Sequence, residues 1–80
     1  MITARQVRAA RALLNWTQEM LADRALVALT ALKRLESGTG LPVRTDTRDL
    51  VQRNLERNGT VFLQSERGEG LMVVRQNTQA

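Results

Sequence analysis

The chain contains 80 residues, 42% of them hydrophobic and 25% charged, with no cysteine and no histidine. This length fits one domain, and the missing residue types exclude zinc modules, disulfide scaffolds and catalytic sites built on cysteine or histidine. Twelve cationic residues, eleven of them arginine, outnumber eight acidic ones and give a net charge of +4. This balance suits a polyanionic partner such as nucleic acid, although GC-rich coding also enriches arginine.

Other classes of function find little support in the sequence. No apolar run approaches the roughly 18 residues that a membrane span needs, so we expect no membrane partner. The carboxylates fall on polar faces or in helix caps, and no glycine-rich phosphate loop follows a strand, so we expect no enzyme, no metal and no cofactor. These features predict a soluble cytoplasmic protein, and its small core favours self-association.

A first helix is predicted to begin at the pattern Thr3-Ala4-Arg5-Gln6. Thr3 caps the helix, and Gln6 reaches back to the Thr3 amide. Arg5 and Arg8 are expected on the solvated side, and the helix ends near Asn15. The apolar residues that recur at helical spacing are Val7, Ala10, Leu13 and Leu14.

Two further helices follow. Thr17 is expected to cap the second helix, whose buried side is marked by Met20, Leu21 and Ala25. The apolar period breaks around residues 26–27, and a third helix is predicted over residues 28–37.

The C-terminal half is predicted to contain one more helix and a β-hairpin. Thr45 or Asp46 caps the fourth helix, and its inward residues are Leu50, Val51 and Leu55. Residues 61–64 and 71–75 are typical of strands, and a long polar loop over 65–70 joins them. The predicted fold is mainly α: a single domain, 1–80, with a helical core over 3–59, a hairpin over 61–75 and a flexible tail over 76–80.

Residues 18–37 resemble a known DNA-binding motif. The residues that carry the likeness are Gln18, Leu21, Ala22, Ala25, Val27, Leu32 and Leu35. Their order is similar to the helix-turn-helix of the phage-repressor-like (Cro/C1, XRE-type) family, and the resemblance extends over about residues 3–59. It implies a four-helix repressor-like domain in a bacterial or phage-type, nucleoid-associated transcriptional regulator, most simply a repressor.

The geometry of the third helix supports this interpretation. At 100° per residue, the apolar residues of the 28–37 helix fall on one face and the polar residues on the other. An outward face with two cations suits a major groove, and the candidates for base contacts are Leu29, Thr30, Lys33 and Arg34. Arg34 suits guanine O6 and N7, and Leu29 suits a thymine methyl group.

The resemblance also implies roles for residues around the motif. It implies contacts to the DNA backbone from Thr17, Gln18, Ser37, Thr39 and Arg44. Gln18 lies at the N-terminus of the second helix, where free backbone amides and the helix dipole independently favour a phosphate. The resemblance further implies a structural ion pair between Arg11 and Glu36 that fixes the third helix against the first.

Two positions depart from the family pattern. The turn usually carries glycine where this chain has Leu26, and a left-handed backbone costs leucine about 1–2 kcal/mol. We therefore expect either a different turn or a second helix that is longer by one residue. Ala28 also cannot cap the third helix. These departures leave an alternative function, a protein-interaction module (an antitoxin or anti-activator) that keeps the fold and binds another regulatory protein.

The hairpin sequence is apolar on both of its faces. Its strands are expected to meet a twofold mate through Val61, Phe62, Leu63, Leu71 and Val73. The resulting homodimer would bind a pseudo-palindromic operator in double-stranded DNA, with recognition helices one helical turn apart. The alternative is a hairpin that packs only on the helices of its own subunit.

Overall fold

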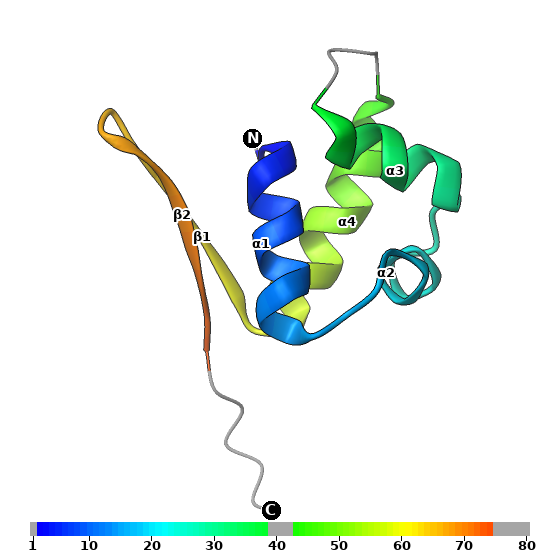
Figure 1. Ribbon diagram of the computed structural model, residues 1–80, viewed down its shortest axis with the longest axis horizontal. Coiled ribbons are helices and arrows are strands. Elements are labelled where there is room, and N and C mark those ends of the chain that lie inside the picture. The colour runs from blue at the N-terminus through cyan, green and yellow to red at the C-terminus, as the bar shows by residue number, and fades with distance from the viewer. Residues whose placement is uncertain (1, 39–42, 75–80) are drawn as a thin grey trace, which may run out of the picture.

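The computed structural model of the protein describes residues 2–38 and 43–74. Within them lie four helices, α1 (Ala4–Leu14), α2 (Gln18–Ala25), α3 (Leu29–Ser37) and α4 (Thr45–Arg57), followed by an antiparallel hairpin of β1 (Thr60–Ser65) and β2 (Gly68–Val73). The predicted order of four helices and a C-terminal hairpin is confirmed. In Figure 1 the hairpin lies on one side of α1, and α2 and α3 lie on the other. The predictions for Thr39 and for the tail, 76–80, concern residues outside this description.

The first two helices begin as their capping residues predict. The Thr3 hydroxyl accepts from the Gln6 backbone N–H at 3.2 Å, and the Gln6 side chain accepts from the Thr3 N–H at 3.0 Å. The Thr17 hydroxyl accepts from the Met20 N–H at 3.1 Å. Each bond satisfies an amide at the helix start that has no partner within the helix.

The prediction that Thr45 or Asp46 caps α4 is wrong. Both residues already belong to the helix, and Arg44 occupies the capping position without a side-chain hydrogen bond. The Asp46 carboxylate instead accepts from the Thr47 N–H at 2.9 Å, so the acidic side chain still stabilises the first turn.

All four helices contribute to one hydrophobic core. Its buried residues are Ile2, Val7, Ala10, Leu21, Ala22, Ala25, Leu32, Leu35, Val51 and Leu55. Met20 and Leu50 were predicted to face inward but are exposed, as is Leu13. Leu50 lies about 100° around α4 from Val51 and so misses the buried side of the helix. Thr47, four residues before Val51, lies on that side and is buried. In so small a domain only a narrow stripe of each helix reaches the core.

The hairpin turn is much shorter than the predicted loop. Ser65 pairs with Gly68, which leaves a turn of two residues, Glu66 and Arg67. The strands continue through polar positions such as the pair of Gln64 and Glu69 because main-chain hydrogen bonds hold the ladder whatever the side chains. The apolar pattern detects most of β1 but only residues 71–73 of β2.

The turn between α2 and α3 keeps the geometry that glycine usually supplies. Leu26 adopts a left-handed conformation (φ 60°, ψ 44°), and α2 ends at Ala25. The predictions of a different turn or a longer helix are therefore wrong. The N–H of Val27 donates to the carbonyl of Ala22 at 3.0 Å, which closes the helix end. The Leu26 side chain is 84% exposed.

Candidate nucleic-acid interface

The outward face of α3 carries the polar residues that the sequence predicts. Thr30, Lys33 and Arg34 are exposed, whereas Leu32 and Leu35 point into the core. Within the described part of the chain, neither cationic side chain of this face forms an ion pair. Both charges are therefore available to an anionic ligand.

Two other predicted members of this face lie differently. Leu29 is partly buried and packs against the core because it is the first residue of α3, next to the turn. The Ser37 hydroxyl donates to the Arg34 carbonyl at 2.8 Å at the end of the helix. At the other end Ala28 offers no side-chain cap, as predicted, so the first amides of α3 lack a capping side chain.

A buried carboxylate anchors α3 to the rest of the domain. Glu36 is 3% exposed, and its two oxygens accept from Nε and Nη2 of Arg11, both at 2.7 Å. Gln18 donates to the same carboxylate at 3.0 Å. The hydrogen bond to Glu36 raises the pKa of Arg11 further above its ordinary value. The structure thus brings together Arg11 and Glu36, the pair that the resemblance implies, and adds Gln18 to it.

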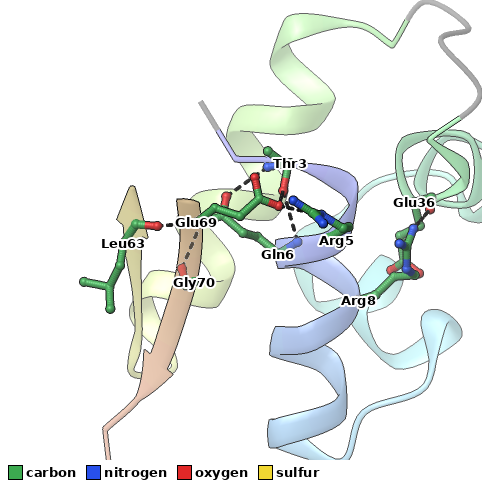
Figure 2. A network of polar contacts seen from close by, with 8 residues as sticks. All are labelled: Thr3, Arg5, Gln6, Arg8, Glu36, Leu63, Glu69 and Gly70. Atoms are coloured by element: carbon green, nitrogen blue, oxygen red, sulfur yellow. Dashed lines mark hydrogen bonds and ion pairs between the residues drawn. The ribbon is translucent and has the colours of Figure 1, made fainter. Parts of the chain in front are cut away.

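Arg8 strengthens this anchor, which the sequence did not suggest. Its guanidinium donates to the main-chain oxygen of Glu36, as Figure 2 shows. Arg8 lies one helical turn before Arg11, so both point toward the end of α3. The three-residue spacing of Arg8 and Arg11 was the sequence feature that could have predicted this contact. It is ambiguous because the same spacing is typical of a solvated helix face.

The residues implied to contact the DNA backbone are spread around α3. Thr17 is exposed at the start of α2, while Gln18 is half-buried and its amide is bonded to Glu36. Arg44 is exposed and forms an ion pair with Asp46 at 3.2 Å. Such an exposed pair is weak and yields readily to a stronger ligand.

The two faces of the hairpin have different surroundings. Phe62 and Leu71 lie opposite each other, and both are half-buried and pack against the core of their own subunit. Their contact with a second subunit stays a prediction. Val73 is half-buried. The opposite face exposes four aliphatic side chains, here called the outer hairpin face: Val61, Leu63, Met72 and Val74. Two of these, Met72 and Val74, escaped the sequence prediction, although the alternation of side chains along a strand places them with Val61 and Leu63.

The described residues also limit other kinds of site. They contain no cluster of acidic side chains that could hold a metal ion. None of the described helices is long and apolar enough to cross a membrane.

Comparison with known proteins identifies the segment that contains this site. Residues 7–44 match the model of a protein family described as Helix-turn-helix. No curated protein gives a significant match to the chain. The matched segment spans all of α2 and α3 and all of α1 except its first turn, and it includes both Arg11 and Glu36.

Proposed function

Because residues 7–44 of this chain belong to the Cro/C1-type helix-turn-helix family of DNA-binding regulators, we propose that it is a sequence-specific transcriptional regulator that reads double-stranded DNA with α3. One observation carries the proposal. Thr30, Lys33 and Arg34 are exposed, and neither cation has an ion-pair partner among the described residues. The opposite side of the same helix is anchored by the buried Glu36 carboxylate. A rigid support of this kind is what base-specific contacts require.

Each polar group of the interface has a role that fits its chemistry. Arg34 presents a planar fork that matches guanine O6 and N7, and Lys33 and Thr30 contact neighbouring base edges. Leu29 keeps enough exposed surface to meet a thymine methyl group at the start of α3. Thr17, Ser37 and Arg44, which are exposed around the helix, position the protein on phosphates. The resemblance implies the same role for Thr39. Gln18 supports them through its bond to Glu36.

The regulator acts in this proposal as a homodimeric repressor. The outer hairpin face carries no charge, and a second copy of the same face is its natural complement, since two chains of net charge +4 repel elsewhere. A twofold pair of α3 helices then binds the two halves of a pseudo-palindrome. Occupancy of such a site blocks a promoter without any ligand or cofactor.

Selection of duplexes from a random pool tests the groove contact. The wild type should enrich one sequence, and Arg34→Ala should relax the preference at a single base position by about 1–3 kcal/mol. Arg67→Ala is the matched control because it removes the same charge at the tip of the hairpin, far from α3 in Figure 1. The proposal fails if no sequence is enriched, or if both variants change binding alike.

The dimer has a separate test in sedimentation equilibrium. The wild-type mass should rise with concentration toward twice the chain mass, and Leu63→Asp should remain a monomer because it buries a charge in the contact. Thr45→Asp, at an exposed position at the start of α4 and outside the hairpin, is the control that should still associate. A wild-type mass that stays monomeric at all concentrations contradicts the dimer.

One observation favours the alternative, a protein-interaction module such as an antitoxin or anti-activator. Leu26 exposes 84% of its surface in the turn that leads into α3, where a large apolar group suits a protein partner better than DNA. Salt dependence separates the two functions. A DNA reader loses duplex affinity steeply as salt rises, and Arg34→Ala lowers its specificity. An interaction module binds duplexes weakly, without sequence preference, and the substitution changes nothing.

A further inference from the structure

One buried amide joins the hairpin to the helical domain. The side chain of Gln6 is 2% exposed, and its Nε2 donates to the carbonyls of Leu63 at 3.2 Å and Gly70 at 2.9 Å. Its Oε1 accepts from the Thr3 N–H at 3.0 Å. Figure 2 shows the amide reaching from α1 to both strands. Leu63 and Gly70 are register partners, so a single side chain holds both strands at one rung of the ladder.

A carboxylate on β2 makes a second connection beside the first. Glu69 accepts from the Thr3 hydroxyl at 2.8 Å and from Nε of Arg5 at 2.9 Å through the same oxygen. Thr3, Arg5 and Gln6 all lie at the start of α1 (Figure 2). The residues that begin the helix therefore also grip the hairpin, and we name this group of contacts from Gln6 and Glu69 the hairpin clamp.

The hairpin clamp fixes the orientation of the hairpin relative to α1, which the apolar contacts do not. Phe62 and Leu71 already pack the hairpin against the core, but hydrophobic contact is non-directional and permits the strands to tilt. Hydrogen bonds from one amide to two opposite carbonyls fix both the angle and the position of the strands along α1. A buried polar group that is fully satisfied is well suited to specify a unique arrangement.

The clamp belongs to a continuous rigid path through the domain. At one end of α1, Gln6 holds the hairpin, and farther along the same helix Arg11 holds Glu36 of α3. Arg8 adds a bond to the main chain of α3 between these two points. The outer hairpin face and the outward face of α3 are thus tied to opposite sides of one helix.

We infer that Gln6 is a positioning residue that sets the spacing between the two half-sites of the operator. This inference rests on the proposed function, in which a second copy packs on the outer hairpin face. In a twofold dimer, the angle between that face and α3 fixes the separation of the two recognition helices. A hairpin that tilts freely allows several separations, whereas a clamped hairpin allows one.

The test measures binding of wild type and Gln6→Met to duplexes that carry two identical half-sites with spacers of different length. Methionine keeps the length and apolar stem of glutamine but cannot donate to the strand carbonyls. We expect the wild type to lose about tenfold in affinity when the spacer changes by two base pairs, and Gln6→Met to lose about threefold or less. Affinity for a single isolated half-site should be the same in both proteins.

Two further variants keep the result interpretable. Gln52→Met makes the same change on α4, where the amide has an exposed bond to Glu56 at 3.2 Å, and should retain the wild-type spacing preference. If Gln6→Met does not fold, as judged by its circular dichroism, Glu69→Gln weakens the clamp more gently and should widen the spacing preference to a smaller degree.

The outcomes separate this inference from the function on which it rests. A Gln6→Met or Glu69→Gln protein that keeps the sharp wild-type preference overturns the inference. So does a wild type that binds its half-sites with no preference for their spacing, although half-site reading by α3 then stands. A wild type that selects no half-site at all overturns the proposed function itself.

Discussion

The strained turn before α3 gives a stability prediction with a defined size. Leu26 has a left-handed backbone at φ 60°, which costs a residue with a Cβ about 1–2 kcal/mol relative to glycine. Glycine loses more freedom on folding, and this offsets about 0.5–1 kcal/mol of the gain. Little apolar burial is lost with the side chain, since it is 84% exposed. Leu26→Gly should therefore stabilise the domain by about 0.5–1 kcal/mol, or roughly 2–8 °C in Tm.

Thermal and urea unfolding followed by circular dichroism measure this effect, and two variants isolate its cause. Leu26→Ala removes the side chain but keeps the Cβ in the same conformation, so it should bring no gain. Among the described residues, Asn15 is the other non-glycine residue that ends a helix in the left-handed region, at φ 62°. Asn15→Gly should change little because asparagine tolerates this region. A Leu26→Gly protein that is no more stable than Leu26→Ala refutes the strain argument.

Three further predictions concern charge and backbone. Arg11→Met should cost about 3–5 kcal/mol in urea unfolding, since it leaves the Glu36 carboxylate buried without its partner. Hydrogen bonds from the Thr3 hydroxyl and the Arg5 guanidinium lower the pKa of Glu69 in the folded state. The ionised Glu69 therefore stabilises the fold fully above about pH 4.3, its unfolded pKa, and this stabilisation is lost as the pH falls through the lower folded pKa. Glu69→Gln should lack this pH-dependent loss of stability in acid unfolding. Gly38→Ala, at φ +66°, should cost about 1–2 kcal/mol. Gly70→Ala, with no atom within 4 Å of the added carbon, should stay within about 0.5 kcal/mol of wild type in the same unfolding assay.

Local chemistry in the sequence was sufficient to locate the starts of α1 and α2. Thr3 and Thr17 cap their helices through side-chain bonds to residues three positions ahead, and such short-range contacts are visible in the sequence itself. The same holds for the outward position of Lys33 and Arg34, which follows from helical geometry once the helix is placed.

Features that depend on distant contacts were not predictable in this way. The amide of Gln6 bonds to carbonyls that are 57 and 64 positions away in sequence, so its pattern suggested only a cap. Propensity argued against a left-handed Leu26, but Leu21 and Ala25 on one side of the turn and Leu32 on the other share one core, and their packing decides where the chain must turn. Tertiary packing here outweighs a local cost of about 1–2 kcal/mol.

The contact between α3 and a duplex can be observed directly by nuclear magnetic resonance. Isotope-labelled protein is titrated with the duplex recovered by selection, and the shifts of backbone amides are mapped onto the structure. We expect the largest changes at Thr30, Lys33 and Arg34, with smaller ones at the start of α2. Changes confined to the hairpin, with those three amides unmoved, would contradict it.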